Sequence, residues 1–202
     1  MSRTLLLVLG AAVVLVLIFG GWIASSYNRL LGLDQAVDAQ WAQVENVYQR
    51  RADLIPNLVE TVKGAAEFER DTLTAVTEAR AKVGQVSAAG GEALTSDPAT
   101  FERWQQAQGE LGGAISRLLV VAEAYPQLTA TQGFRDLQVQ LEGTENRISV
   151  ERMRFNETAR DFNVARQRFP TNLVAGFFGP QFAVTPYFSA DEGAEHAPAV
   201  DF

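Results

Sequence analysis

The chain has 202 residues, a net charge of −7 at pH 7, no cysteine and a single histidine, His196. These counts exclude disulfides, thiolate zinc sites, iron–sulfur clusters, cysteine nucleophiles and multi-histidine metal sites. The acidic balance disfavours nucleic acid as a partner, because proteins that bind it cluster Lys and Arg to neutralise phosphate.

The first predicted element is an apolar segment near the N-terminus. Residues 5–24 (LLLVLGAAVVLVLIFGGWIA) carry no charge, and as a helix they would span about 30 Å, the thickness of a bilayer's hydrocarbon core. Trp22 and Tyr27 stand at its exit, where amphipathic rings favour the headgroup layer. A cleaved signal peptide is the alternative, but its apolar core is usually shorter. We predict that residues 1–26 are a transmembrane anchor that contacts the lipid bilayer through residues 5–24.

Residues 27–188 have the composition of long helices. Apolar residues recur on one helix face over 30–48. A second helix is predicted to begin near Asp53, whose carboxylate can cap it ahead of Pro56, and to continue to about Lys82. The alternative is one long helix with a kink at Pro56.

A loop and a third helix are predicted next. Gly, Ser, Asp and Pro indicate the loop over 88–98. The third helix is expected from Phe101 to about Ala124, with Asp97 or Thr100 as its cap.

The fourth segment has the most regular pattern in the chain. Apolar residues recur at every seventh position: Phe134, Leu141, Ile148, Phe155, Phe162 and Phe169. This period predicts one long helix, gently supercoiled against its neighbours and ended by Pro170. No strand-like alternation appears. The fold class is therefore all-α: an N-terminal single transmembrane helix followed by an antiparallel bundle of three to four long helices.

The C-terminal part divides into two pieces. Residues 176–188 (GFFGPQFAVTPYF) hold five aromatic side chains and no charge. We expect them to fold back on the bundle; the alternative is docking on a membrane surface or an adjacent protomer, and the lack of basic residues disfavours anionic headgroups. Residues 189–202 are predicted to be a disordered acidic tail, which leaves 27–188 as the bundle domain.

One group of polar residues lies around the predicted start of the second helix: Arg50, Arg51, Asp53 and Asn57. Two guanidinium groups beside a helix N-terminus suit an anion or a partner. Asp53 would compete for the same arginines, so a helix cap with interhelix ion pairs is the simpler interpretation.

Two further polar groups lie in the fourth helix. The first comprises three poor helix formers, Asn146, Asn156 and Asn163. Their amides can bond to neighbouring helices and fix the register, or line a polar pocket. The second comprises Glu142, Glu145 and Glu151. They resemble a carboxylate metal site, but the bundle has no histidine to complete one, so a charged outer face explains them more simply.

Four stretches carry a family resemblance: YNRL at 27–30, RRADLIPNLVETVKG at 50–64, TENRI at 144–148, and FNETARDFNVARQRFPTNLVAG at 155–176. Together they resemble the LemA family of bacterial membrane-anchored helical proteins. The resemblance implies a helical bundle on one N-terminal anchor, a link with membrane organisation including magnetosome formation, and no established catalytic residues. Phe68 stands where the family usually has a histidine, so histidine chemistry there is untenable in this chain.

No phosphate-binding loop, dinucleotide fingerprint or nucleophile elbow occurs in the sequence. We therefore predict a non-enzymatic structural or interaction protein without cofactor or metal, which self-associates as a homo-oligomer at the bacterial inner membrane. The alternatives are an accessory subunit of a membrane protease or transporter, and a membrane-surface hydrolase using the carboxylates of Asp53 and Glu60. Arg3 and Arg29 balance each other across the anchor, so they predict neither side of the membrane for the bundle.

Overall fold

The computed structural model describes residues 3–63 and 69–189. Within these ranges the chain is helical and has no β-strand, which confirms the all-α class. The long helices are α1 (Arg3–Lys63), α2 (Arg70–Gly90), α3 (Pro98–Glu123) and α5 (Gln132–Gln167). The short helical segments are η1 (Gly91–Leu94), α4 (Pro126–Thr129), α6 (Thr171–Phe178) and η2 (Gly179–Phe182).

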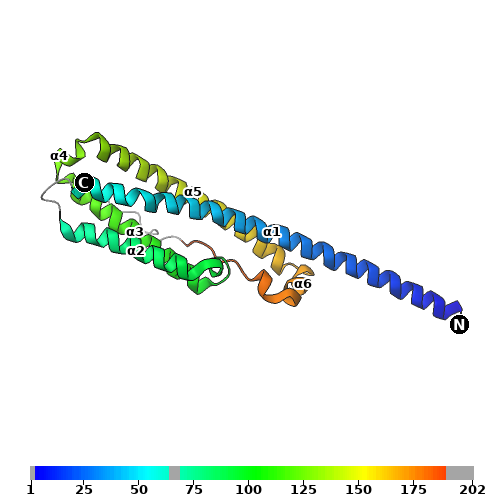
Figure 1. Ribbon diagram of the computed structural model, residues 1–202. Coiled ribbons are helices and arrows are strands. Elements are labelled where there is room, and N and C mark those ends of the chain that lie inside the picture. Colours follow the sequence, from blue (N-terminus) through cyan, green and yellow to red (C-terminus); the bar gives the residue numbers. More distant parts are fainter. Residues whose placement is uncertain (1–2, 64–68, 190–202) are drawn as a thin grey trace, which may run out of the picture.

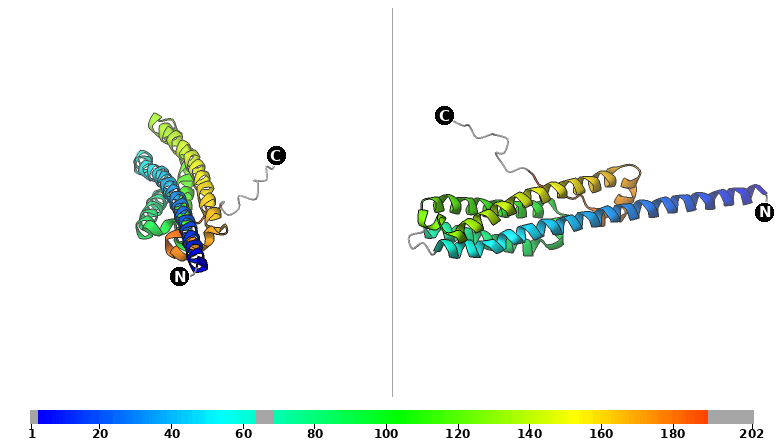
Figure 2. Two further views of the ribbon diagram at one scale, coloured as in Figure 1. Left: turned by 90° about the vertical axis from the view of Figure 1, so that its right-hand side faces the viewer. Right: turned by 90° about the horizontal axis from the view of Figure 1, so that it is seen from above.

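Each long helix runs antiparallel to the one before it, along one common axis (Figure 1, Figure 2). The C-terminal half of α1 packs mainly against α5, and α2 packs mainly against α3. Residues 3–24 of α1 project beyond the bundle, and α6 lies beside α1 at the end where this projection begins (Figure 1).

α1 is a single helix of 61 residues. It runs through Asp53, so the prediction of a new helix there is wrong, and the alternative of one long helix is the one found. Proline has no N–H, so Pro56 frees the carbonyl of Ala52 one turn earlier. Arg80 of α2 satisfies that carbonyl, because its Nε donates a hydrogen bond to the Ala52 oxygen at 3.1 Å. The next described helix, α2, begins at Arg70 and runs in the opposite direction (Figure 1).

The predicted loop over 88–98 is shorter in the structure, because α2 continues to Gly90 and η1 follows it. α2 can end there because Gly91 has a φ of 46°, which glycine adopts without a Cβ clash. The predicted cap of the third helix is confirmed, since the Asp97 side chain accepts a hydrogen bond from the Thr100 N–H at 3.0 Å.

α5 spans 36 residues, as the seven-residue period predicts. The first five members of the row are buried: Phe134, Leu141, Ile148, Phe155 and Phe162. The sixth, Phe169, is 76% exposed, because α5 ends at Gln167 and the residue lies beyond it. Its assignment to the buried row is therefore wrong.

The core has two halves along the bundle axis. The anchor-side core is aromatic and includes Trp41, Tyr48, Phe101, Trp104, Phe155, Phe162, Phe182 and Phe188. The distal core is mainly aliphatic and includes Leu54, Ile55, Leu58, Val62, Val76, Leu111, Ile115, Leu118 and Leu141. On α1 the division falls between Tyr48 and Leu54.

Candidate functional site

A polar layer separates the two halves of the core. Arg51 of α1 is only 4% exposed, and its Nη1 donates to the Glu145 Oε1 of α5 at 3.0 Å. Its Nη2 donates to the main-chain carbonyl of Gln108 on α3 at 3.1 Å and also to the side-chain oxygen of that residue. The guanidinium carbon lies 5.0 Å from the ring centre of Tyr48. One buried cation thus joins three helices at one level, which fixes their register.

A groove opens over the polar layer, with a volume of about 280 Å³. Arg51, Gln108 and Glu145 line it, together with glycines of α3 whose missing side chains leave the space open. A Cβ at Gly112 would lie 3.6 Å from Arg51 Nη1, so even an alanine would reach the guanidinium there. The Arg51 Nε has no hydrogen-bond partner among the described residues. Glu145 offsets the charge of Arg51, and Arg152 adds a second arginine to the lining, so the groove offers hydrogen-bonding groups with one excess positive charge.

The polar residues around Asp53 do not form a cluster in the structure. Only Arg51 turns into the core, whereas Arg50 and Asn57 are exposed. Asp53 is exposed too, and it accepts a hydrogen bond from the Gln49 amide at 2.7 Å. Since α1 continues through this region, the helix N-terminus on which an anion site would depend is absent from α1 here.

The carboxylates proposed for hydrolysis are also apart. Glu60 is exposed and pairs with Lys63 at 2.9 Å. Asp53 lies seven residues before it on the same helix, a rise of about 10 Å. The two groups therefore cannot share one reacting atom.

The three glutamates of α5 bind different partners. Glu142 accepts from Gln138, Glu145 pairs with Arg51, and Glu151 accepts from Gln40 of α1 at 2.7 Å. Among the described residues no group of three or more Asp, Glu or His is placed to hold a metal ion.

Two of the three asparagines of α5, Asn156 and Asn163, hold an extended segment, residues 183–189, which we call the strap, whereas Asn146 is exposed. The Asn163 Nδ2 donates to the Thr185 carbonyl at 2.8 Å, and the Thr185 N–H donates back to Asn163 Oδ1 at 3.1 Å. One heptad earlier, Asn156 makes the same pair of bonds with Phe188, at 3.0 and 2.8 Å. Each amide thus pairs with a backbone residue as a neighbouring strand would. The expected bonds between helices are replaced by bonds to the strap.

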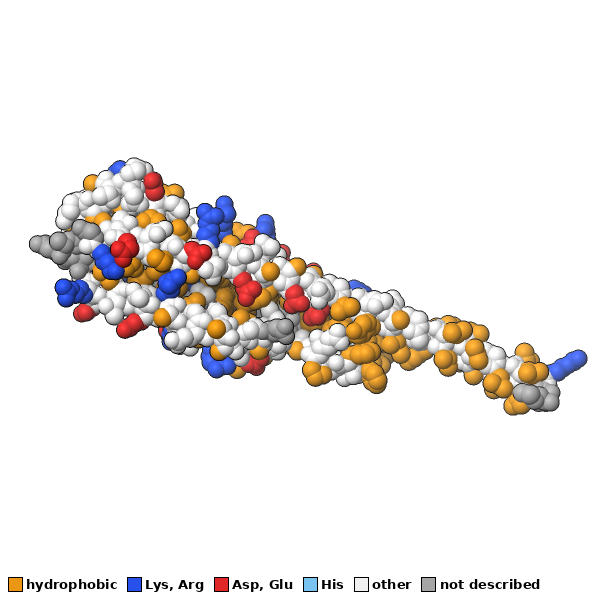
Figure 3. All heavy atoms as spheres, in the orientation of Figure 1, with side chains coloured by type: hydrophobic (Ala, Val, Ile, Leu, Met, Phe, Trp, Pro, Cys, Tyr) orange, Lys and Arg blue, Asp and Glu red, His pale blue; other side chains and the backbone are white. Residues whose placement is uncertain are grey.

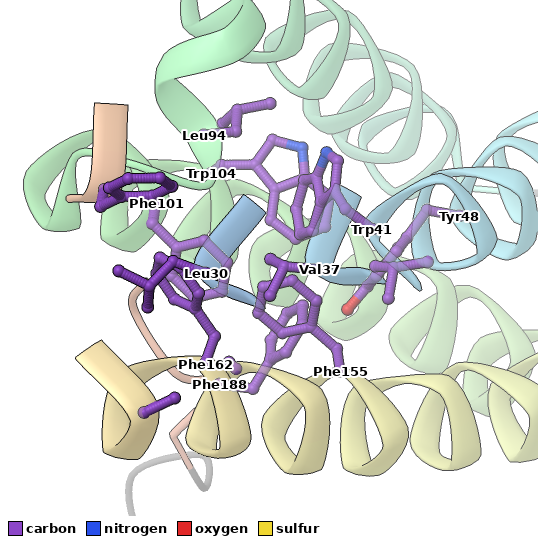
Figure 4. Packing of buried hydrophobic residues seen from close by; sticks show 14 of the residues in the cluster. Leu30, Val37, Trp41, Tyr48, Leu94, Phe101, Trp104, Phe155, Phe162 and Phe188 are labelled. Atoms are coloured by element: carbon purple, nitrogen blue, oxygen red, sulfur yellow. The ribbon is translucent and has the colours of Figure 1, made fainter. Parts of the chain in front are cut away.

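Phe188 fixes the far end of the strap in the anchor-side core (Figure 4). Its ring centre lies 4.9 Å from that of Phe101 on α3 and 5.5 Å from that of Phe155 on α5. Trp41 of α1 stacks at 6.3 Å. The expectation that the aromatic segment folds back on the bundle is met by Phe182 and Phe188, which are buried, and not by Phe177, which is exposed.

The strap ends beside the groove. Gln105 of α3 donates to the Ser189 side chain at 2.8 Å, and Arg152 of α5 donates to the Ser189 carbonyl at 2.9 Å. Both residues also line the groove. Sequence reasoning did not find Gln105, Gln108 or Arg152, because nothing in the helical pattern distinguishes them from solvated polar residues. The predicted acidic tail beyond Ser189, with His196, lies outside the described residues.

In the part of the chain that the structure describes, two carboxyl groups have a displaced pKa, and neither lies in the polar layer. Burial raises the pKa of Asp34 on α1, and the nearby charge of Asp38 raises it further. Hydrogen bonds from the Thr100 side chain and then from its backbone N–H lower the pKa of Asp97.

The projecting half of α1 presents apolar side chains to its surroundings. The large apolar residues between Leu5 and Phe19 are exposed on all sides of the helix. By length and composition α1 is the one described helix that is suited to cross a membrane.

Together these features define a class: an all-helical bundle whose first helix extends beyond it as a candidate membrane span. The chain belongs to the LemA family, whose family model matches residues 40–202. The matched region covers the bundle from the middle of α1 onwards and includes the polar layer and the strap.

Three magnetosome proteins are similar to the chain. Magnetosome protein MamQ of Magnetospirillum gryphiswaldense is 26% identical over 196 residues, which cover 90% of this chain and 71% of the relative. Magnetosome proteins MamQ 1 and MamQ 2 of Paramagnetospirillum magneticum are each 25% identical over 191 residues, covering 88% of this chain and 70% of each relative.

Proposed function

We propose that this protein is a non-enzymatic structural protein that spans the bacterial inner membrane once and associates with copies of itself. The observation that supports this most is the continuity of α1. The apolar stretch 5–24 and the core residues from Leu30 to Val62 belong to one helix. A helix without a break between the two parts would hold the bundle at a fixed height above the bilayer.

The engagement of the polar residues supports a structural role. Arg51 joins three helices, Asn156 and Asn163 bind the strap, and Asp53 and Glu60 bond to neighbours on their own helix. Membership of the LemA family and the magnetosome proteins among the relatives support a role of this kind at a membrane.

Confinement to a membrane favours self-association, because weak lateral contacts act at a raised local concentration. The anchor also carries two pairs of small residues, Gly20 with Ala24 and Gly21 with Ser25, which let helices approach closely. A Cβ at Gly20 or Gly21 would meet nothing within 4 Å, so this face of the anchor is open to a second helix.

The test is the mass of the full-length chain in detergent, measured across a range of protein concentrations. We expect a species larger than the 22.0 kDa monomer. Gly21→Leu is expected to shift it towards the monomer, and Gly10→Leu, outside the small-residue pairs, serves as the control. A monomer at every concentration would contradict self-association.

Cross-linking in cells separates self-assembly from the alternative roles. A major adduct of the chain with itself supports the proposal. A major adduct with a protease or a transporter subunit would instead favour an accessory role.

A further inference from the structure

α6 has an apolar face that nothing in the described structure covers. Its inner face, Val174 and Ala175, is buried against the bundle. On the outer side, Leu173 and Phe177 are one helical turn apart and are 57% and 85% exposed, and Phe169, two residues before the helix, is 76% exposed. Large apolar side chains gathered on one exposed face mark a contact with another molecule or with a membrane.

This face lies at the level where the anchor leaves the bilayer. The ring centre of Tyr27 on α1 is 4.7 Å from that of Phe178 and 5.5 Å from that of Phe182. Tyr27 is three residues beyond Ala24, the end of the apolar stretch, which is a rise of about 4.5 Å. The headgroup layer is about 5–7 Å deep on each side of the hydrocarbon. α6 therefore stands beside the headgroup layer of any bilayer that the anchor spans.

The charges at this end suit a membrane surface. Residues 22–33 and 162–182, which lie at this end, contain three arginines and no Asp or Glu: Arg29, Arg166 and Arg168. Asp34 and Asp161 come next along α1 and α5. The whole chain, by contrast, has a net charge of −7. The aromatic segment 176–188 has no basic residue of its own, but Arg29 and Arg168, which lie outside it, are exposed and can reach anionic headgroups.

We propose that α6 and the turn before it form a second membrane contact, with Leu173 and Phe177 of the helix and Phe169 of the turn inserted into the interfacial layer of the bilayer that the anchor crosses. The proposal rests on the proposed membrane anchoring. The bilayer is the occupant because the apolar surface of α6 continues that of the anchor, as Figure 3 shows where hydrophobic side chains gather beside the projecting helix.

A second membrane contact would restrict how the bundle moves relative to the bilayer. A single helix in a bilayer leaves the bundle free to rotate about the helix axis and to tilt. Insertion of α6 on one side fixes both, in the way that interfacial amphipathic helices lie in the membrane plane. Each copy then presents the same face of its bundle sideways, which assists contacts between copies.

The experiment uses the full-length chain in vesicles of phosphatidylcholine and phosphatidylglycerol at a low protein-to-lipid ratio. Because the chain has no cysteine, a single introduced cysteine can carry an NBD fluorophore. The test site is Phe177→Cys. Val139→Cys on α5 is the control for a label exposed to water, because Val139 is 67% exposed at the far end of the bundle. Leu15→Cys reports whether the anchor lies in the bilayer. Circular dichroism verifies the helical fold of each variant.

The readouts are quenching by a shallow nitroxide-labelled lipid and by aqueous iodide. For Phe177→Cys we expect loss of emission with the lipid quencher and protection from iodide, and for Val139→Cys the reverse. Iodide quenching at 177 while the label at 15 is protected would overturn the α6 contact and leave the anchor intact. Protection from both quenchers would mean that protein covers α6, which also overturns it. Iodide quenching at 15 would overturn the anchoring itself.

Discussion

Asn163→Ala is expected to release the strap while the bundle stays folded. Asn163 is 3% exposed and binds both the N–H and the carbonyl of Thr185, which is itself 4% exposed. It also donates to the hydroxyl of Tyr187 at 2.9 Å. The substitution removes every one of these bonds and adds no steric clash.

The size of the effect follows from the two backbone groups that lose their partner. A buried polar group left unpaired costs about 1–3 kcal/mol. The strap avoids this cost by detaching, since its backbone then bonds to water. A change of about 2 kcal/mol in favour of the detached strap raises its population about 30-fold.

Hydrogen exchange measured by mass spectrometry on the peptide that contains residues 183–189 provides the assay. We expect faster exchange there in Asn163→Ala and little change in α1 and α3. Asn146→Ala is the control, because Asn146 is exposed on the same helix. Unchanged exchange in residues 183–189 would refute the idea that Asn163 holds the strap on the bundle. Equally faster exchange in all the long helices would instead mean that Asn163 fixes helix register.

Two further substitutions test the electrostatics of the bundle by thermal unfolding in detergent. Glu145→Gln is expected to lower the free energy of unfolding by about 1 kcal/mol, because Glu145 is half-exposed and solvent screens its bond to Arg51. This loss should vanish in an Arg51→Met background. An equal loss in that background would contradict the pairing. Folding raises the pKa of Asp34, so stability falls as pH rises through the folded pKa. Asp34→Asn should therefore raise Tm at pH 7 and leave it unchanged in acid, where Asp34 is protonated; a fall in Tm at pH 7 would contradict this.

The features that the sequence predicts correctly depend on residues close together in the chain. The row from Phe134 to Phe162 indicates one helix because its period lies within a single element. Asp97 caps the helix that begins at the next residue, so its role is also local. Phe169 is the informative error, since the period continues past the point where Pro170 ends the helix.

The features that the sequence does not predict depend on partners far along the chain. Pro56 suggests a helix boundary because proline cannot donate the backbone hydrogen bond to the residue one turn earlier. The donor that replaces this bond, Arg80, belongs to the next helix, so the sequence around Pro56 does not reveal it. The sequence does not indicate what the asparagine amides bind, because a side-chain amide can pair with any peptide group. Their partner turned out to be the backbone of the strap, which has no periodic pattern of its own.

The strap connects the anchor end of the bundle with the groove over the polar layer. It begins directly after η2, whose Phe182 contacts Tyr27 at the foot of the anchor, and it ends at Ser189 beside the groove over Arg51. Arg166 of α5 also donates to the Phe182 carbonyl, which ties the start of the strap to the bundle. Asn163 and Asn156 hold the backbone between these two points. A single extended segment, bonded to α5 along its length, thus joins the foot of the anchor to the polar layer.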